Sequence, residues 1–337
     1  GSRNGDWSDF MWGGGLFASG AAVDLAGVEL DHNYLYCSQL LSGNGGALYL
    51  TGGRASLVDC VFRTNYVARG AVDRAGTIGG TLYATGLSTL AITNCAFIGG
   101  FNTAYAGTST VGKGGFAYFS GASQTVTMKN CVVTDMGRRA SQQTYDSGTL
   151  TLASGTLVLE NVLVNGSRGN AIEVTGGTAA ITNATIAGAT AISGDVMGFG
   201  IKQSAGALTL RNSILWDNAL GGASLAGGTA DIAYTLSQEE LAGQGNRSED
   251  PLFADDTYRH LFSRAGYLAD GWFGGRWTTD RPRAGLGGMS PAIDAGDPAA
   301  DCSAEPDPRG KRVNLGAYGG TPYASLSLRQ PSVIVLR

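Results

Sequence analysis

The sequence predicts an all-β solenoid in which short parallel strands wind into about eight stacked coils. Two observations support this fold class: a phrase that recurs along the chain, and an alternation of apolar and polar residues inside each copy. Repeats of this length are typical of solenoids, because each coil can bury its apolar face only against its neighbours. The clear copies span 45–62, 79–97, 114–133, 147–164, 170–186 and 200–215, and weaker copies span 15–30 and 223–237.

Each copy contains an alternating run, a bend with glycine, a second alternating run and then Asn or Asp. Asn tolerates a left-handed backbone, and its side chain can bond the equivalent bend of the next coil. The shortest spacing, 22 residues, is about what three short strands and three bends require. We call the recurring positions the ladder; they are Gly27, Asp59, Asn94, Asn130, Asn161, Asn183, Asn212 and Tyr234.

The alternation has period two, which favours strands over the 3.6-residue period of a helical solenoid. Apolar residues of one parity should therefore point inward. Cys60, Cys95 and Cys131 each follow a ladder residue and should stack inside the coils, where small buried thiols are favoured over a metal or redox site because no His joins them. The inward set includes Leu48, Leu50, Leu82, Ala84, Leu90, Ile92, Leu157, Leu159, Ile181, Leu208 and Leu210.

The amino-acid composition narrows the possible classes of protein and partner. The 337 residues carry 15% charged side chains, 54 glycines and a net charge of −4, which argues against a nucleic-acid or anionic-membrane partner. The sequence contains no run of about 20 apolar residues, so it predicts no membrane-spanning helix. Five cysteines, an odd number, do not indicate a disulfide framework. The leading Gly1-Ser2 resembles a tag remnant, so we expect a monomeric segment of a longer precursor, with its secretion signal elsewhere.

The C-terminal quarter carries a series of short motifs. They are DPLF at 250–253, YRHL at 258–261, SPAIDAGD at 290–297 and NLGAYGG at 314–320. This series resembles the ending of right-handed parallel β-helix proteins of bacterial surfaces and secretions, including polymorphic outer-membrane-like and choice-of-anchor surface proteins. The resemblance implies a single-stranded right-handed parallel β-helix at the bacterial cell surface or outside the cell, and it leaves the chemistry open.

The open end of a β-helix exposes strand edges and core, and we expect the C-terminal region to cover it. The predicted organisation is a lead-in or partial coil at 1–14, the β-helix at 15–249, a capping region at 250–325 and a terminal strand or linker at 326–337. We treat these as parts of one elongated molecule.

Aligned coils place aromatic residues at one outward position of the first strand. Phe17, Tyr49, Tyr83 and Tyr118 share this position, and Thr151, Glu173 and Lys202 continue the line. Exposed rings about 4.8 Å apart would form an apolar platform for sugar rings or a protein partner. Packing between coils is the competing interpretation.

Insertions after the ladder bend emerge on one flank, at 31–43, 63–78, 99–113, 135–146 and 187–199. Repeat proteins often bind partners on such a flank. The candidate binding residues there are Tyr66, Tyr105 and Arg69, and Trp272 and Trp277 in the C-terminal region are further candidates. An acidic polysaccharide would fit these aromatic and basic loops. The alternative interpretation is that the loops only pack against one another.

We expect no cofactor, with bound calcium as an open possibility at Asp294, Asp297 and Asp301. The favoured function is a non-catalytic extracellular domain that binds glycan or protein ligands, of the adhesin or passenger type. The alternative is a secreted polysaccharide lyase or glycoside hydrolase that acts on an acidic polysaccharide. Its candidate catalytic residues are Tyr145, Arg138, Arg139, Asp135 and Lys113.

Overall fold

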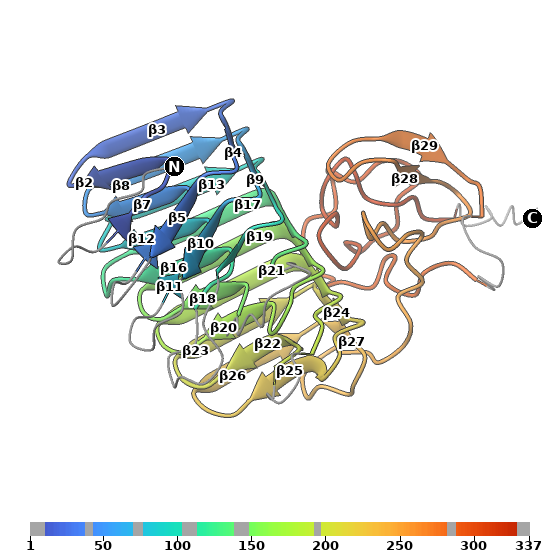
Figure 1. The fold of residues 1–337 in the computed structure, drawn as a ribbon. Helices are drawn as coiled ribbons and strands as arrows, with labels where there is room; N and C mark the ends of the chain where they lie inside the picture. The colour runs from blue at the N-terminus through green and yellow to red at the C-terminus, as the bar shows by residue number, and fades with distance from the viewer. Residues whose placement is uncertain are drawn as a thin grey trace, which may run out of the picture.

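The computed structural model describes residues 11–37, 43–69, 77–102, 113–137, 148–191, 197–281 and 288–328. Over these ranges the chain is all-β, with a stack of parallel coils and an irregular C-terminal region beside it (Figure 1). The ranges contain no helix with the length and apolar character that a membrane crossing requires. The predicted fold class, a parallel β-helix, is confirmed.

The first face of the solenoid is a parallel sheet of eight strands, and each strand pairs in register with the next coil. Its strands are β2 (Leu16–Ser19), β7 (Leu48–Thr51), β12 (Leu82–Thr85), β16 (Ala117–Ser120), β18 (Leu150–Leu152), β20 (Ile172–Val174), β22 (Phe199–Gln203) and β25 (Gly221–Leu225).

The other two faces form a parallel sheet of 13 strands that bends at the ladder. In three coils one ten-residue strand runs through the bend, and these strands are β17 (Thr125–Thr134), β19 (Thr156–Asn165) and β21 (Thr178–Ala187). The remaining strands are β3 (Ala22–Ala26), β4 (Glu29–Asp31), β8 (Arg54–Val58), β9 (Val61–Arg63), β13 (Thr89–Thr93), β14 (Ala96–Ile98), β23 (Ala207–Arg211), β24 (Ile214–Trp216), β26 (Thr229–Ala233) and β27 (Leu236–Ser237).

The insertions add small parallel sheets of their own. One comprises β1 (Met11–Trp12), β6 (Gly43–Asn44) and β11 (Thr77–Ile78), and another comprises β5 (Tyr34–Cys37), β10 (Tyr66–Arg69) and β15 (Phe101–Asn102). The C-terminal region contains an antiparallel pair, β28 (Tyr267–Ala269) and β29 (Arg276–Thr278).

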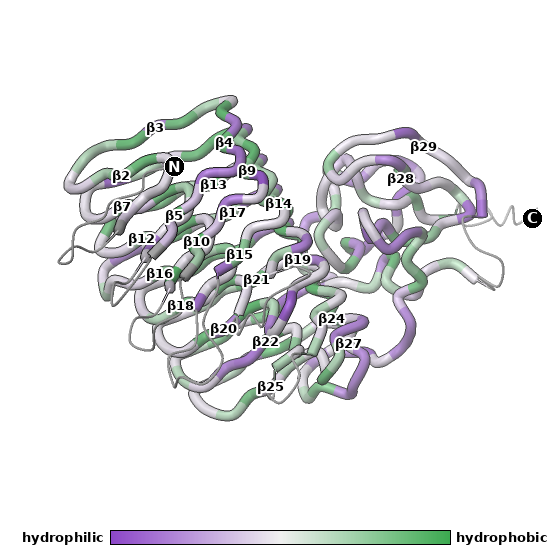
Figure 2. Tube along the Cα trace, in the orientation of Figure 1, coloured by the Kyte–Doolittle hydropathy of each residue, from purple (hydrophilic) through white to green (hydrophobic). Residues whose placement is uncertain are grey.

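The core lies inside the coils, as the alternation predicts. Ile92 is fully buried between Leu57 and Met128 of the adjacent coils, which pair with it in register. Apolar residues recur at equivalent places of successive coils (Figure 2). All eleven predicted inward residues are buried to 2% exposure or less. Because side chains alternate across a strand, this parity fixes which face of each strand meets the core.

The ladder has the expected backbone and bonding. Every ladder residue has positive φ, between 50° and 62°. The Asn130 Nδ2 donates to Asn94 Oδ1 at 3.2 Å, and the Asn94 Nδ2 donates to Asp59 Oδ1 at 3.0 Å. Left-handed backbone costs Asn and Asp little compared with other non-glycine residues, which explains their choice at this bend.

The cysteine column is buried, as predicted. Cys60, Cys95 and Cys131 are at most 2% exposed, and none forms a disulfide. Each thiol donates to the backbone carbonyl two residues earlier at 3.2 Å. Burial raises the pKa of Cys95 and of Cys131 to about 12, so these thiols stay protonated and unreactive at neutral pH.

The C-terminal region lies against the side of the solenoid rather than over its end (Figure 1). Asn161 of the ladder donates to the carbonyls of Ala317 and Gly319, at 3.0 and 2.8 Å. The Asn183 Nδ2 donates to the same Gly319 carbonyl at 3.1 Å. The region therefore docks on the ladder side chains of the later coils. On the earlier coils the ladder side chains bond to one another instead.

The segment 238–247 follows the last coil and covers its edge. The Tyr234 amide donates to the Gln244 carbonyl at 2.8 Å, and the Ser237 amide donates to the Arg247 carbonyl at 2.9 Å. Leu241 packs against the main core. We expected residues 250–325 to cover this end of the solenoid, but the short segment 238–247 covers it instead. Its backbone carbonyls accept hydrogen bonds from amides of the last coil.

Glu305 organises the interior of the C-terminal region. Its Oε1 accepts the backbone amides of Asn314 and Gly320, at 2.8 and 2.7 Å. The side chain is buried, and desolvation raises its pKa from 4.5 to about 7.

We expect the free energy of unfolding to decrease as the pH rises from about 4.5 to about 7, the window set by the raised pKa of Glu305. Below this window Glu305 is protonated in both the folded and the unfolded state. Within the window the carboxyl is ionised in the unfolded state but still protonated in the folded state. The free energy of unfolding therefore decreases by at most about 1.4 kcal/mol for each pH unit. Denaturant titrations across the window measure this slope. Glu305→Gln keeps an acceptor oxygen and should flatten the slope; an unchanged slope in this variant would assign the effect to other groups.

Candidate functional site

The aromatic residues of the first face form one column. Phe17, Tyr49, Tyr83 and Tyr118 are successive partners in register, with ring centroids 5.3, 4.9 and 5.7 Å apart. Their interplanar angles are 28°, 19° and 2°, and Trp12 stacks on Phe17 at 5.4 Å. The rings therefore cover one another's faces and present their edges outward. This geometry favours packing between coils, because a sugar platform needs open ring faces.

The line continues in register through Thr151, Glu173 and Lys202, but its chemistry changes. Thr151 is 1% exposed, and Glu173 is buried and accepts a hydrogen bond from Asn170 Nδ2 at 2.7 Å. Thr151 and Glu173 are thus buried at this position, Lys202 is half-buried, and the aromatic stripe ends at Tyr118.

The insertion flank contains a second aromatic column. Tyr66 lies between Tyr34 and Phe101, with centroids 5.3 and 4.5 Å apart and planes within 9°. Arg69 ends β10, and the Lys113 backbone bridges to Ile78. Tyr105, Arg138, Arg139 and Tyr145 lie outside the described residues.

The two tryptophans of the C-terminal region differ in their surroundings. Trp272 is half-buried and packs, with Phe273, near Val132 and Leu163 of the solenoid. Trp277 is 43% exposed in β29. Trp272 therefore lies at the interface with the solenoid, and Trp277 lies away from it.

The aspartates suggested for calcium are used by turns of the C-terminal region. Asp294 Oδ1 accepts from the Gly310 amide and the Ser327 hydroxyl, at 3.1 and 2.8 Å. Asp297 and Asp301 each accept a backbone amide two residues ahead. Hydrogen bonds from Ser303 lower the pKa of Asp301. The described residues contain no cluster of three or more His, Cys, Asp or Glu side chains suited to a metal.

A second column of left-handed residues follows the ladder. It lies five residues after seven of the eight ladder positions, at His32, Thr64, Gly99, Asp135, Gly166, Gly188 and Asp217, with φ from 49° to 76°. Gly166 and Gly188 separate the two aspartates along the column. A Cβ on Gly188 would lie 3.1 Å from Asn165 Oδ1 and 3.4 Å from Arg259 Nη2. These glycines therefore leave room for a hollow and for the arginine.

A groove of about 690 Å³ lies beside this column, between the solenoid and the C-terminal region. We call it the flank groove. Its lining residues are Thr134, Asp135, Asn165, Gly166, Gly188, Ala189, Thr190, Trp216, Asp217, Asn218, Ala219, Gln238, Asp256, Thr257 and Arg259. Asp135 is thus placed in the groove, whereas the described residues that line it do not include Lys113.

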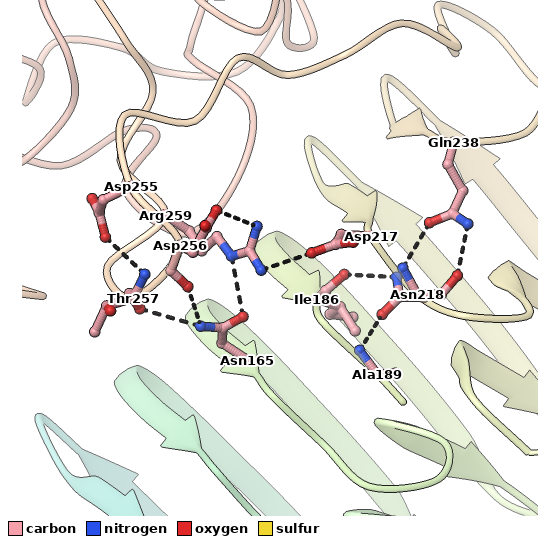
Figure 3. A network of polar contacts seen from close by, with 10 residues as sticks. All are labelled: Asn165, Ile186, Ala189, Asp217, Asn218, Gln238, Asp255, Asp256, Thr257 and Arg259. Atoms are coloured by element: carbon pink, nitrogen blue, oxygen red, sulfur yellow. Dashed lines mark hydrogen bonds and ion pairs between the residues drawn. The ribbon is translucent and has the colours of Figure 1, made fainter. Parts of the chain in front are cut away.

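Arg259 joins the two walls of the groove (Figure 3). Its side chain is only 7% exposed, and its Nη2 lies 3.1 Å from Asp217 Oδ2 while its Nη1 lies 3.5 Å from Asp256 Oδ1. Its Nε donates to Asn165 Oδ1 at 3.1 Å. The guanidinium carbon also lies 5.3 Å from the centroid of the Phe253 ring, within cation–π range. The charge pairs therefore fix the position of residues 256–259 on the solenoid.

The opposite part of the groove is rigid for a similar reason. The Asn218 side chain donates to the Ile186 carbonyl and accepts from the Ala189 amide, both at 3.1 Å. The Gln238 side chain accepts from the Asn218 amide at 2.8 Å and donates to the Asn218 carbonyl at 2.7 Å (Figure 3). A preformed polar site with an indole nearby, from Trp216, suits a polar ligand that has apolar faces.

The net charge of the groove is negative among the described residues that line it. They include the carboxylates of Asp135, Asp217 and Asp256 and one guanidinium, which is already paired.

Sequence reasoning missed Asp217, Asp256, Arg259 and Trp216. Asp217 had a signal, because it follows the ladder residue Asn212 by the same five residues that separate Asn130 from Asp135. Arg259 had no comparable signal, since its partner Asn165 is 94 residues away in the chain.

Fold and groove together define a parallel β-solenoid with a lateral groove. A family model described as the right-handed β-helix region matches residues 9–191. The chain therefore belongs to the right-handed β-helix family. Searches of curated proteins and of solved structures gave no match.

Proposed function

We propose that this chain is a carbohydrate-binding β-helix domain of a larger bacterial surface or secreted protein, of the adhesin or passenger type. The observation that supports it best is the flank groove, which combines the Trp216 indole with fixed carboxylate and amide groups. The location outside the cell is supported by the resemblance of the C-terminal motifs, whose residues Ser290, Asn314 and Tyr318 are buried structural elements here.

A glycan suits the groove better than an apolar ligand. Its volume of about 690 Å³ lies within the ~300–1,000 Å³ typical of small-molecule sites. Sugar hydroxyls donate to carboxylates such as Asp135, while the apolar face of a pyranose can lie on an indole. The excess of carboxylates favours neutral or amino sugars over uronates.

Ala219→Trp tests the groove by filling it. Ala219 is exposed and lines the groove, so an indole there should occupy ligand space and leave the backbone bond from Ala219 to Ala189 intact. We expect the wild-type chain to bind neutral or amino-sugar glycans on an array, and the variant to lose at least tenfold in affinity by calorimetry.

Ala226→Trp is the matched control, because Ala226 is exposed and does not belong to the groove lining. It should bind as the wild type does. Equal binding by both variants, or binding of uronate polymers alone, would contradict the proposal.

A glycoside hydrolase is the second candidate, because the groove contains more than one carboxylate. Asp217 and Asp256 contact the same guanidinium and so lie together, while Asp135 lies three coil spacings from Asp217, roughly 14 Å along the backbone. A glycosidase needs two carboxylates about 5–9.5 Å apart. Release of reducing ends from an array hit, abolished by Asp217→Asn and by Asp256→Asn, would favour this candidate; ligand binding without product favours the binding domain.

A further inference from the structure

The first coil of the solenoid forms one end of the stack, away from β25 and β26 (Figure 1). Its strands β2, β3 and β4 each pair, within the part of the chain that the structure describes, with one strand of the second coil. The last coil differs, because the segment 238–247 bonds its edge. The first coil therefore presents strand edges whose outward backbone groups can pair with a further strand.

The apolar interior of the solenoid is also open at this end. Leu16 and Leu25 point inward and pack against the core, but both remain partly exposed. Their partners in register on the second coil, Leu48 and Leu57, have no exposed surface. A further coil would remove the apolar surface of the first coil from water, as each coil does for its neighbour.

The first coil carries acidic side chains at this end. Residues 11–37 include Asp24, Glu29 and Asp31, and they contain no Lys or Arg. The side chains of Asp24 and Glu29 are each 59% exposed. A second copy that met this end with its own first coil would bring like charges together, whereas a segment with basic side chains would be attracted.

The solenoid already pairs charges between adjacent coils. Arg54 Nη1 lies 3.0 Å from Asp24 Oδ1, and Arg63 Nε lies 2.9 Å from Glu29 Oε1. Both arginines belong to the second coil and approach the carboxylates from behind. A carboxylate has two oxygens and accepts several hydrogen bonds, so it can also pair with a basic side chain in front. Further pairs between coils are Lys129 with Glu160 and Arg211 with Asp231.

We propose that the open end of the first coil binds a β-strand segment of another protein, which carries basic side chains and adds in register as a further coil. Main-chain hydrogen bonds to β2, β3 and β4 would supply affinity. Inward apolar residues of the segment would cover Leu16 and Leu25, and its basic residues would pair with Asp24 and Glu29. The partner is therefore defined by apolar residues with period two and by Lys or Arg on the outward side.

A peptide with the sequence of residues 47–63 is the probe, because this sequence already forms the coil that pairs with the first one. It contains both Arg54 and Arg63, and Cys60→Ala in the peptide prevents disulfide formation. We expect the full chain to bind this peptide in a fluorescence anisotropy titration. Hydrogen exchange in 16–31 should slow when the peptide binds. The same peptide with Arg54→Glu and Arg63→Glu should bind at least tenfold more weakly.

The double variant Asp24→Asn with Glu29→Gln removes both charges from the full chain and preserves the size of the side chains. We expect it to bind the peptide about fivefold more weakly, the effect of two exposed ion pairs. Asp231→Asn is the matched control, because Asp231 also pairs with an arginine of the adjacent coil but lies on β26. It should bind the peptide as the wild type does.

Three outcomes would overturn the proposal: no binding of the peptide, equal binding of the charge-reversed peptide, or equal effects of the double variant and Asp231→Asn. Sedimentation velocity of the chain alone examines the competing occupant. A dimer that the double variant strengthens would assign this end to a second copy and would also overturn the proposal. The carbohydrate binding proposed for the flank groove is judged separately, by the wild type against Ala219→Trp.

Discussion

Ile92→Asp is expected to unfold the central coils. Ile92 is fully buried, and its neighbours Leu57 and Met128 are buried as well, so the new carboxylate would have no polar partner inside the stack. Burying an unpaired charge in a packed core costs more than about 4 kcal/mol, a large part of the free energy of unfolding of most domains. Chemical denaturation followed by circular dichroism measures this loss.

Ala91→Asp provides the control one position away. Ala91 belongs to the same strand and is exposed, so its carboxylate would remain in water. We expect a change of less than about 0.5 kcal/mol. If the two variants had equal stability, the assignment of the inward face would fail, and with it the stacking of the coils.

Arg259→Met is expected to loosen the contact of residues 250–275 with the solenoid. The variant loses the ion pairs to Asp217 and Asp256 and the hydrogen bond to Asn165, and it leaves the Asn165 oxygen without this donor. The Asp217 and Asp256 side chains are 62% and 70% exposed and stay solvated, so the main cost is the Asn165 oxygen that loses its donor, about 1–3 kcal/mol. The cost should be concentrated at the interface, because the solenoid coils retain their own pairing and core.

Hydrogen exchange monitored by mass spectrometry distinguishes this local effect from global unfolding. Protection should fall in 250–275 and persist in β17, β19 and β21. Arg54→Met serves for comparison, since Arg54 pairs with Asp24 on the early coils and is 56% exposed. A uniform loss of protection along the chain, or an equal effect of both variants, would show that Arg259 does not hold the interface.

The repeat was sufficient to predict the architecture, for a physical reason. A coil must bury its apolar parity against its neighbours, and the ladder bend requires residues that accept a left-handed backbone. Both requirements are local and recur in every copy, so Ile92 and Asn94 could be assigned from their positions within the repeat. The in-register pairing of Phe17, Tyr49 and Tyr83 followed from the same alignment.

The role of the aromatic column could not be predicted in the same way. Alignment places Tyr49 and Tyr83 one above the other, but their side-chain rotamers decide whether faces or edges meet the solvent. In the structure the planes lie within 19° of each other, with centroids 4.9 Å apart. The column therefore contributes to packing between coils.

The sequence by itself determined the coil, its inward face and its ladder, because these depend on residues that lie near one another within a repeat. The tertiary structure decided where the C-terminal region rests and, with it, the flank groove. Arg259 and Asn165 are 94 residues apart, and Trp272 packs against a cluster that includes Val132, 140 residues earlier in the chain. Such contacts follow no period, since they depend on how an irregular segment fits the side of the finished solenoid.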